Sequence, residues 1–179
     1  MSAALVFALT VSAAAAPPPL FQDGEAMQLM RDACVGTELD RAAFERLGSE
    51  RRWRTVRMTQ RSGEPGWNVS FRKGDVTIMM LGDAESNGAE SSSGVVCSVS
   101  VERVSPALEG QVSDLAASLG LGDEAPFLDQ PPEMVPIRIW SRFGDKTLTY
   151  AAAPDGRAVI SLSRQVVSIL PPPASPPGN

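Results

Sequence analysis

The residues best suited to bind a ligand are arginines concentrated between positions 51 and 73. This window carries six arginines and one lysine against a single acid, Glu64, so its net charge is +6, whereas the whole chain has a net charge of −5. Because the guanidinium fork matches carboxylate and phosphate groups, the window predicts a surface for an anionic partner. The alternative is that these arginines are solvated strand exteriors paired with acids of neighbouring strands. The candidate binding residues are Arg54, Arg57, Arg61 and Arg72.

The chain contains no histidine, which excludes much of enzyme chemistry. Imidazole is the commonest general base near neutral pH, so Ser-His-Asp and Cys-His hydrolases are excluded. With two cysteines and no histidine, the chain lacks the usual ligands for structural zinc, haem or iron–sulfur clusters. No cofactor is therefore predicted, and an enzyme would depend on carboxylates, a Ser-Lys pair, Tyr150 or a hard cation.

Three short motifs resemble catalytic or metal sites, and each departs from its pattern where the chemistry is decided. Ser70 and Lys73 have S-x-x-K spacing, but a predicted strand would point them to opposite faces. The acidic loop 83–90 has calcium-loop spacing, yet Gly94 stands where a bidentate glutamate is required. Glycoside hydrolysis needs two carboxylates at a particular separation, which closeness in sequence does not determine. A second acidic group could supply such carboxylates and comprises Asp123, Glu124, Asp129 and Glu133. No catalytic or metal-binding residue is predicted.

Two tryptophans are distinguished by the parity of their predicted strands. Trp67 alternates in phase with its apolar neighbours, which predicts a place in the core. Trp140 is out of phase with Ile137 and Ile139, which predicts an exposed ring on the other side of its strand. Trp140 therefore joins the candidate binding residues as a contact residue.

Residues 1–16 have the pattern of an export signal. An uncharged apolar run from Ala3 ends in four alanines and precedes three prolines, as in a signal peptide and its cleavage region, although no basic residue precedes the run. The run is too short to span a bilayer comfortably, so no transmembrane span is expected in the mature chain. We predict a signal peptide over 1–16, a Pro-rich linker over 17–22, and a periplasmic or secreted protein.

Export changes the meaning of the two cysteines, Cys34 and Cys97. In an oxidising compartment two thiols usually form a disulfide, and no C-x-x-C motif indicates redox chemistry. Cys97 falls on the apolar parity of its predicted strand, and Cys34 ends a helix expected to cover that sheet. We predict a Cys34–Cys97 disulfide with Cα atoms within about 7 Å of each other.

Hydrophobic periodicity predicts the elements that position these residues. A first helix is predicted over 24–34 with Asp23 as its N-cap. A second helix is predicted from a capping box of Thr37 and Asp40 to a stop at Gly48. From Trp53 the period changes to two, which predicts four strands, the last two separated by a polar loop over 82–94.

Ser105 and Pro106 open a third predicted helix that ends at Gly120, and three strands follow a Pro-rich connection. Runs of consecutive strands indicate an α+β fold, with an antiparallel sheet of about six to seven strands and helices packed on one face. A single domain is predicted over 23–170, followed by a Pro-rich disordered tail over 171–179.

The order of these features resembles that of small secreted bacterial proteins of unknown function. The resemblance covers residues 24–103 and rests on the export signal, Cys34 near the end of a first helix, a second short helix, Trp53, and Cys97 on a later strand. It is a resemblance of pattern and implies no activity.

These observations favour an exported, non-enzymatic binding protein whose Arg-rich hairpin meets an anionic partner, either a protein or an envelope component. Nucleic acid is disfavoured by the negative net charge and the export signal. Two alternatives stay open. One is a histidine-free hydrolase that uses carboxylates or a metal, and the other is an acidic inhibitor or immunity-type protein that blocks a basic enzyme with the 83–90 loop.

Overall fold

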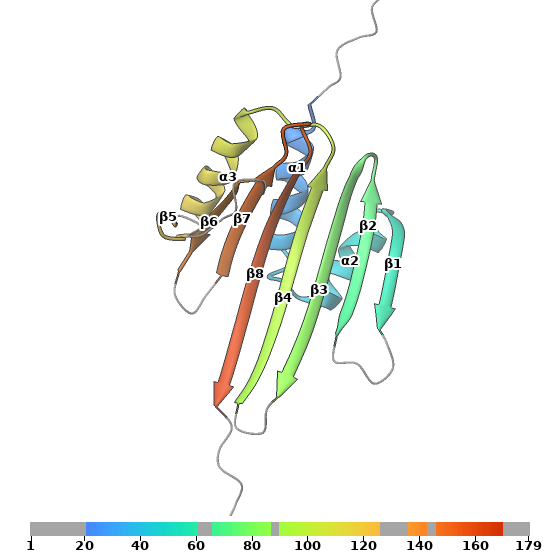
Figure 1. The fold of residues 1–179 in the computed structure, drawn as a ribbon. Coiled ribbons are helices and arrows are strands. Elements are labelled where there is room, and N and C mark those ends of the chain that lie inside the picture. Colours follow the sequence, from blue (N-terminus) through green and yellow to red (C-terminus); the bar gives the residue numbers. More distant parts are fainter. Residues whose placement is uncertain (1–20, 61–65, 87–89, 126–135, 143–145, 170–179) are drawn as a thin grey trace, which may run out of the picture.

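The protein is built on an eight-stranded antiparallel sheet with helices on one of its faces (Figure 1). This computed structural model describes residues 21–60, 66–86, 90–125, 136–142 and 146–169. The strands follow the order β1-β2-β3-β4-β8-β7-β6-β5. The predicted α+β class and antiparallel sheet are confirmed, and the sheet has slightly more strands than the six to seven predicted.

Helices and strands follow one another as predicted, with β5 added. The helices are α1 (Asp23–Leu29), the π-helix η1 (Met30–Val35), α2 (Arg41–Glu50) and α3 (Ala107–Ser118). The strands are β1 (Arg54–Gln60), β2 (Trp67–Lys73), β3 (Val76–Ser86), β4 (Glu90–Val101), β5 (Glu124–Ala125), β6 (Ile137–Ser141), β7 (Lys146–Ala152) and β8 (Ala158–Ile169). The extra strand arises because two residues of the predicted connection pair with β6.

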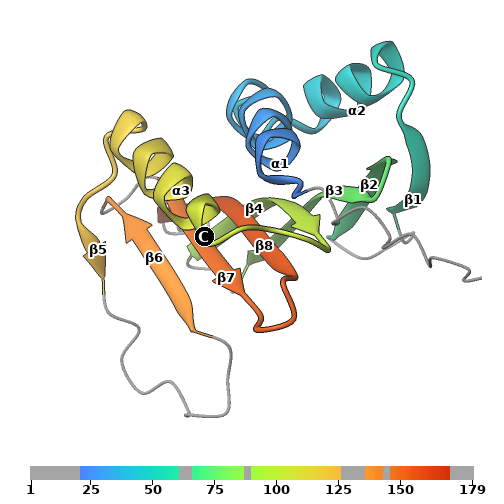
Figure 2. The same ribbon diagram turned by 90° about the horizontal axis from the view of Figure 1, so that it is seen from above.

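The sheet consists of two four-stranded meanders that meet at β4 and β8. In each meander consecutive strands are neighbours, and the last strands of the two meanders pair antiparallel along their full length. Helices α1, η1 and α2 precede the first meander and lie over it, whereas α3 precedes the second meander and lies over that one (Figure 2). Each half is thus a helical cover followed by a meander, although the sequence shows no convincing repeat.

One row of residues across the sheet shows how alternation builds the core. Met80, Cys97, Leu162 and Leu148 occupy adjacent registers in β3, β4, β8 and β7, and all four are fully buried on the helix side. Their neighbours along each strand point to the other side, which no described helix covers. We call this side the open face. Burial of the apolar row stabilises the sheet by about 25 cal/mol for each Å² removed from water.

Helix α1 begins and ends differently from the prediction. Asp23 is its first residue and not its N-cap, because its carboxylate accepts the Ser105 N–H at 2.9 Å and the Ser105 hydroxyl, which ties α1 to the start of α3. The chain then becomes π-helical, and the Gly36 N–H donates to the Arg31 carbonyl at 2.7 Å, five residues back. A Cβ at Gly36 would lie 2.9 Å from the Asp32 carbonyl oxygen, so glycine suits the end of this wide turn.

The predicted capping box of α2 is also corrected. Asp40 is the N-cap, and its carboxylate accepts the Ala43 N–H at 2.7 Å. Thr37 instead donates its hydroxyl to the Ala33 carbonyl at 2.6 Å, within the preceding segment. Asp40 alone therefore caps the helix, and Thr37 takes no part in the cap.

The predicted stop of α2 at Gly48 is wrong, because the helix continues to Glu50. Gly48 has a packing role instead. A Cβ at this position would lie 2.5 Å from the ring of Phe71 in β2, and that ring is itself buried against Phe44 and Trp53. The missing side chain allows α2 to pack closely on β2.

The predicted polar loop 82–94 is mostly strand. β3 extends to Ser86 and β4 begins at Glu90, and the pairing continues through Asp83 opposite Gly94. The Gly94 N–H donates to the Asp83 carboxylate at 3.2 Å. Gly94 also pairs with Gln165 in β8, so a second ladder supports this polar stretch and overrides its low strand propensity.

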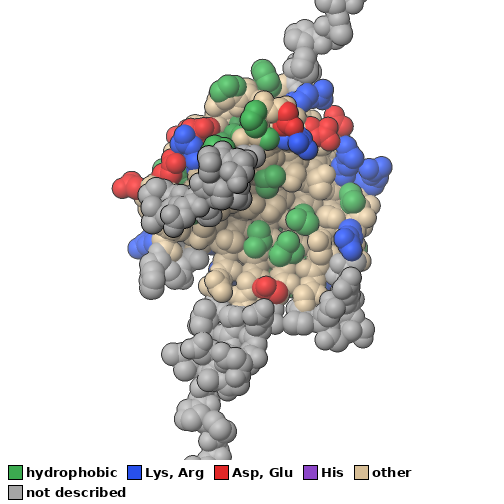
Figure 3. Space-filling view, viewed as in Figure 1, with side chains coloured by type: hydrophobic (Ala, Val, Ile, Leu, Met, Phe, Trp, Pro, Cys, Tyr) green, Lys and Arg blue, Asp and Glu red, His purple; other side chains and the backbone are tan. Residues whose placement is uncertain are grey.

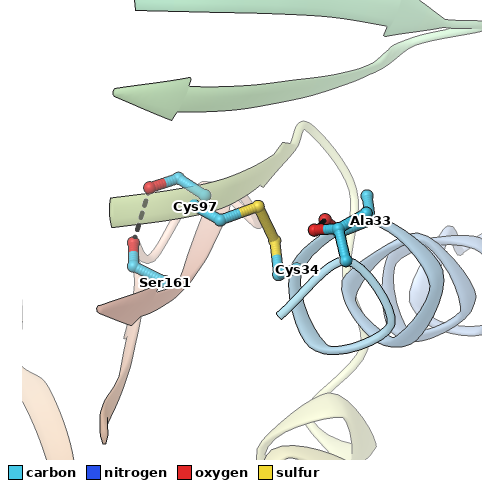
Figure 4. Close-up of a disulfide and its surroundings, with 6 residues drawn as sticks. Ala33, Cys34, Cys97 and Ser161 are labelled. Atoms are coloured by element: carbon cyan, nitrogen blue, oxygen red, sulfur yellow. Dashed lines mark hydrogen bonds between the residues drawn. A yellow bond between two sulfur atoms is a disulfide. The ribbon is translucent and has the colours of Figure 1, made fainter. Parts of the chain in front are cut away.

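Cys34 and Cys97 are joined in a disulfide, as predicted (Figure 4). Their Cα atoms lie 5.4 Å apart, and both residues are fully buried. The bond connects η1 to β4, where the hydroxyls of Ser98 and Ser161 lie 2.9 Å apart across the β4–β8 pair. The covering helix is thereby fixed covalently to a strand at the junction of the two meanders.

The predicted signal peptide and tail, and most of the linker, lie outside the described residues. Among the described residues, no helix has the length and hydrophobicity needed to cross a membrane.

Gly48→Ala is expected to lower the free energy of unfolding by about 1–3 kcal/mol, because the methyl group would overpack the Phe71 ring. Chemical denaturation measures the change. The matched control is Gly110→Ala in α3, where nothing lies within 4 Å of the new Cβ. This control should raise the free energy of unfolding by about 0.5–1 kcal/mol through helix propensity. Stabilisation by both substitutions would contradict the close packing of α2 on β2.

The double variant Cys34→Ser/Cys97→Ser is expected to lose about 2–5 kcal/mol of stability, since the cross-link restricts the unfolded chain. Its melting temperature should fall by several degrees in a thermal unfolding experiment without reductant. The wild-type protein, unfolded without reductant, should show no free thiol. Titration of two thiols per chain would contradict the disulfide.

Candidate anion-binding site

A hollow of about 650 Å³ lies where the start of β1 and the end of β2 meet α1 and η1. Five of its ten lining residues are cations, and one, Asp32, is an acid. We call these cations and the next arginine along β1 the basic corner, which comprises Arg51, Arg52, Arg54, Arg57, Arg72 and Lys73. Lys and Arg side chains gather at the β1 edge of the open face (Figure 3).

The end of α2 positions the first arginines of the basic corner. Here the Trp53 N–H donates to the Gly48 carbonyl at 2.9 Å and the Arg52 N–H to the Ser49 carbonyl at 3.1 Å, which is a Schellman motif. Arg52 consequently has a left-handed backbone, with φ of 54°. Helix α3 ends in the same motif with Gly120 at the equivalent position, φ 67°. The chain therefore has an arginine where backbone conformation favours glycine.

The β1–β2 pairing brings further arginines together on the open face. Arg54 lies directly opposite Arg72, and Arg57 lies opposite Ser70. Arg54 and Arg57 are three residues apart and would point to opposite faces in a regular strand, but a bulge at Val56 restores their phase. Like charges directly opposite each other destabilise a sheet, so this pairing has an electrostatic cost.

Acids neutralise only part of the basic corner. Three exposed ion pairs are present, Lys73–Glu25 at 3.2 Å, Arg51–Asp32 at 3.9 Å and Arg72–Asp75 at 3.7 Å. Exposed pairs of this kind each contribute about 0–1 kcal/mol. Arg52, Arg54 and Arg57 are exposed and form no ion pair within the described part of the chain. Positive charge is thus left available to a ligand.

The structure separates the four arginines predicted from the sequence. Arg54 and Arg72 line the hollow, Arg57 lies outside its lining opposite Ser70, and Arg61 falls outside the described residues. The hollow is also lined by Arg51 and Arg52 from the connection after α2, which lie in the charged window but outside the predicted set. The predicted stop of α2 at Gly48 did not include the turn after Glu50 in which these two arginines lie.

The prediction that Trp140 is exposed is wrong. Trp140 is only 4% exposed, and it pairs with Leu148 on the helix side of the sheet. Ile137 and Ile139 lie on the open face instead and are partly buried. Because both faces of β6 carry apolar residues, alternation alone did not identify the face that the helices cover.

Trp67 lies at the margin of the core and not in its centre. The ring is partly buried and lies over Gly82 of β3, where a Cβ would come within 2.6 Å of it. The guanidinium of Arg41 lies 5.1 Å from the ring centroid, within cation–π range. These contacts give Trp67 a structural role.

The motifs that resembled catalytic or metal sites have structural contacts among the described residues. Ser70 lies on the open face and Lys73 on the helix side, as predicted. Asp83 is hydrogen-bonded within its hairpin, and Glu124 binds Arg138 at 2.9 Å, while the last two acids of its group lie outside the described residues. No cluster of three or more potential metal-binding side chains occurs in the described ranges.

Tyr150 is the remaining side chain with potential enzyme chemistry. Burial raises its pKa above the ordinary value of 10.0, and the nearby carboxylates of Glu109 and Asp23 raise the pKa further. A tyrosine that acts as a nucleophile is activated by a base or by a lowered pKa. The surroundings of Tyr150 therefore favour a neutral, structural phenol.

Comparisons with known proteins provide no assignment for this site. No protein-family model, curated protein or solved structure matches the chain.

Arg52→Gly is expected to raise the free energy of unfolding by about 1 kcal/mol, because glycine adopts the left-handed conformation without steric cost. Gly120→Arg makes the reciprocal change in the same motif of α3 and should lower the free energy of unfolding by a similar amount. Chemical denaturation measures both. Destabilisation by Arg52→Gly would show that contacts of the side chain, and not its charge alone, matter at this position.

Proposed function

We propose that the protein is an exported, non-enzymatic binding protein whose basic corner holds an anionic partner, either a protein or an envelope component. The observation that carries the proposal is the state of Arg52, Arg54 and Arg57. They are exposed and form no ion pair within the described ranges, although acids outnumber bases in the chain by 21 to 16. In a chain rich in acids, this cluster is available to an external anion.

The chemistry of the side chains supports this proposal. Each guanidinium presents paired N–H donors that match a carboxylate or a phosphate. An anion placed between Arg54 and Arg72 would relieve the repulsion between these two opposite residues. Arg52 adds a charge at a position where glycine would be the more stable choice, so a role of its charge is the simplest explanation for it.

Export is part of the proposal. The buried disulfide fits an oxidising compartment, and the described residues include no helix that could cross a membrane. Together with the signal-peptide pattern over 1–16, these features support a periplasmic or secreted location.

The two alternative functions gain less support. A hydrolase using carboxylates needs acids that converge without counter-ions, but Glu124 and Glu109 both bind Arg138. An acidic inhibitor would present the 83–90 segment, and Asp83 in that segment is hydrogen-bonded within its hairpin.

The double variant Arg54→Glu/Arg57→Glu is expected to weaken binding of short polyphosphate and of polyglutamate by about tenfold or more, since two attractive charges become repulsive. Fluorescence anisotropy of labelled probes measures the affinity. Wild-type affinity should also fall as salt is raised, because exposed charges are screened. Both positions are exposed, so thermal unfolding should confirm that the variant stays folded.

The matched control is Arg142→Glu/Arg164→Glu, which makes the same change in net charge at two exposed arginines outside the hollow. This control should bind both probes much more tightly than Arg54→Glu/Arg57→Glu. Equal losses in the two variants would show that net charge alone attracts the probes. Undiminished binding by Arg54→Glu/Arg57→Glu would contradict a site at the basic corner.

A further inference from the structure

Strand β1 is an edge strand whose outer side pairs with no described residue. It is the first strand in the sheet order and pairs only with β2 (Figure 1). From Arg54 to Met58 every residue is exposed, including two apolar side chains, Val56 at 55% and Met58 at 53%. These exposed residues include ones that face each side of the sheet, so no described helix covers either side of this edge.

The hydrogen-bonding pattern of the sheet shows which backbone groups of β1 face outwards. The two-residue turn 74–75 makes Lys73 and Val76 the hydrogen-bonded pair that closes the β2–β3 hairpin. Hydrogen-bonded and non-hydrogen-bonded pairs alternate along antiparallel strands. Followed from β3 through β4 and β8 to β7, the same alternation makes Ala153 and Arg157 a hydrogen-bonded pair. This bond is present, because the Ala153 N–H donates to the Arg157 carbonyl at 2.7 Å.

Applied to β1, the same alternation distinguishes two neighbouring residues. Ser70 directs its backbone groups towards β1, and Val69 directs its groups towards β3. Arg57 is opposite Ser70 and bonds to β2, whereas Met58 is opposite Val69 and presents its N–H and C=O to the free edge. Met58 therefore offers a donor and an acceptor to an additional strand.

The charge on this edge selects the kind of strand that can be added. A second copy of β1 would bring arginines against arginines, which is the usual way in which proteins block pairing of their own edges. Because of the bulge at Val56, Arg54 and Arg57 lie on one face opposite residues that are two apart on β2. Carboxylates at every second position of an added strand would match this spacing.

We propose that an extended acidic segment of a partner protein adds to the free edge of β1 as a further strand. Backbone hydrogen bonds at Met58 would supply affinity, and acidic side chains at alternate positions would bind Arg54 and Arg57. The inference rests on the proposed function, since it uses the same arginines, and it adds the partner class and the mode of recognition. Exposed Val56 and Met58 would contact the apolar residues between the acids.

The test uses a short peptide in which glutamate alternates with valine, and compares it with polyphosphate, which has charge but cannot form a strand. Met58→Pro removes one outward N–H and keeps every arginine. It should weaken peptide binding by about tenfold relative to Met58→Thr, which also loses the methionine side chain but keeps the N–H. Polyphosphate binding should be equal in the two variants.

A second measurement leaves the protein unaltered. The same peptide with N-methyl groups on alternate residues keeps its charges but cannot donate backbone hydrogen bonds along one edge, and should bind wild-type protein about tenfold more weakly. Equal affinity of methylated and unmethylated peptides would overturn strand addition while leaving the proposed function intact. Undiminished binding of polyphosphate by Arg54→Glu/Arg57→Glu would instead overturn the proposed function. Dimerisation of wild-type protein with rising concentration, blocked by Met58→Pro, would show that a second copy occupies the edge.

Discussion

The antiparallel pairing of β4 with β8 is the interaction on which the rest of the structure depends. It joins two meanders that would otherwise be separate sheets, and it places Cys97 next to Leu162 in the centre of the buried row. The disulfide from Cys97 then fixes η1, and with it α1, over the first meander. One wall of the hollow, with Gln28 and Asp32, comes from these helices, so the strand at the centre of the core also anchors one side of the site.

The helical cover extends over only part of the sheet, and this incomplete cover creates the functional surface. Helix α2 packs on β2 through Gly48 and Phe71, which leaves β1 beyond the helix. An uncovered edge strand normally risks aggregation, and arginines together with a bulge are two of the devices that limit it. Here the same devices gather positive charge beside the hollow. Protection of the edge and recognition of an anion are thus compatible uses of one arrangement.

The structure departs from the sequence-based predictions where contacts between distant segments outweigh local signals. Asp23 is of a residue type that commonly caps helices, but its carboxylate accepts a hydrogen bond from Ser105, far away in the sequence. Trp140 was placed on the wrong face because isoleucines on the open face of β6 imitate a core pattern. The polar residues after Gly82 form strand because β4 pairs on both sides. Local propensity is a weak guide in each case, since tertiary pairing contributes more free energy.

The sequence by itself determined the α+β class, the antiparallel strands, the Cys34–Cys97 disulfide and the concentration of arginine before Lys73. Periodicity, cysteine number and charge can be read from the chain without knowing which segments pair. Only the tertiary structure decided which face the helices cover, that β1 is an edge, and that Arg52 joins Arg54 and Arg72 around one hollow. These depend on strand order and on the end of α2. Alternation with period two assigns residues to two faces but is the same whichever face is buried, and strand order is set by pairing between residues far apart in the chain.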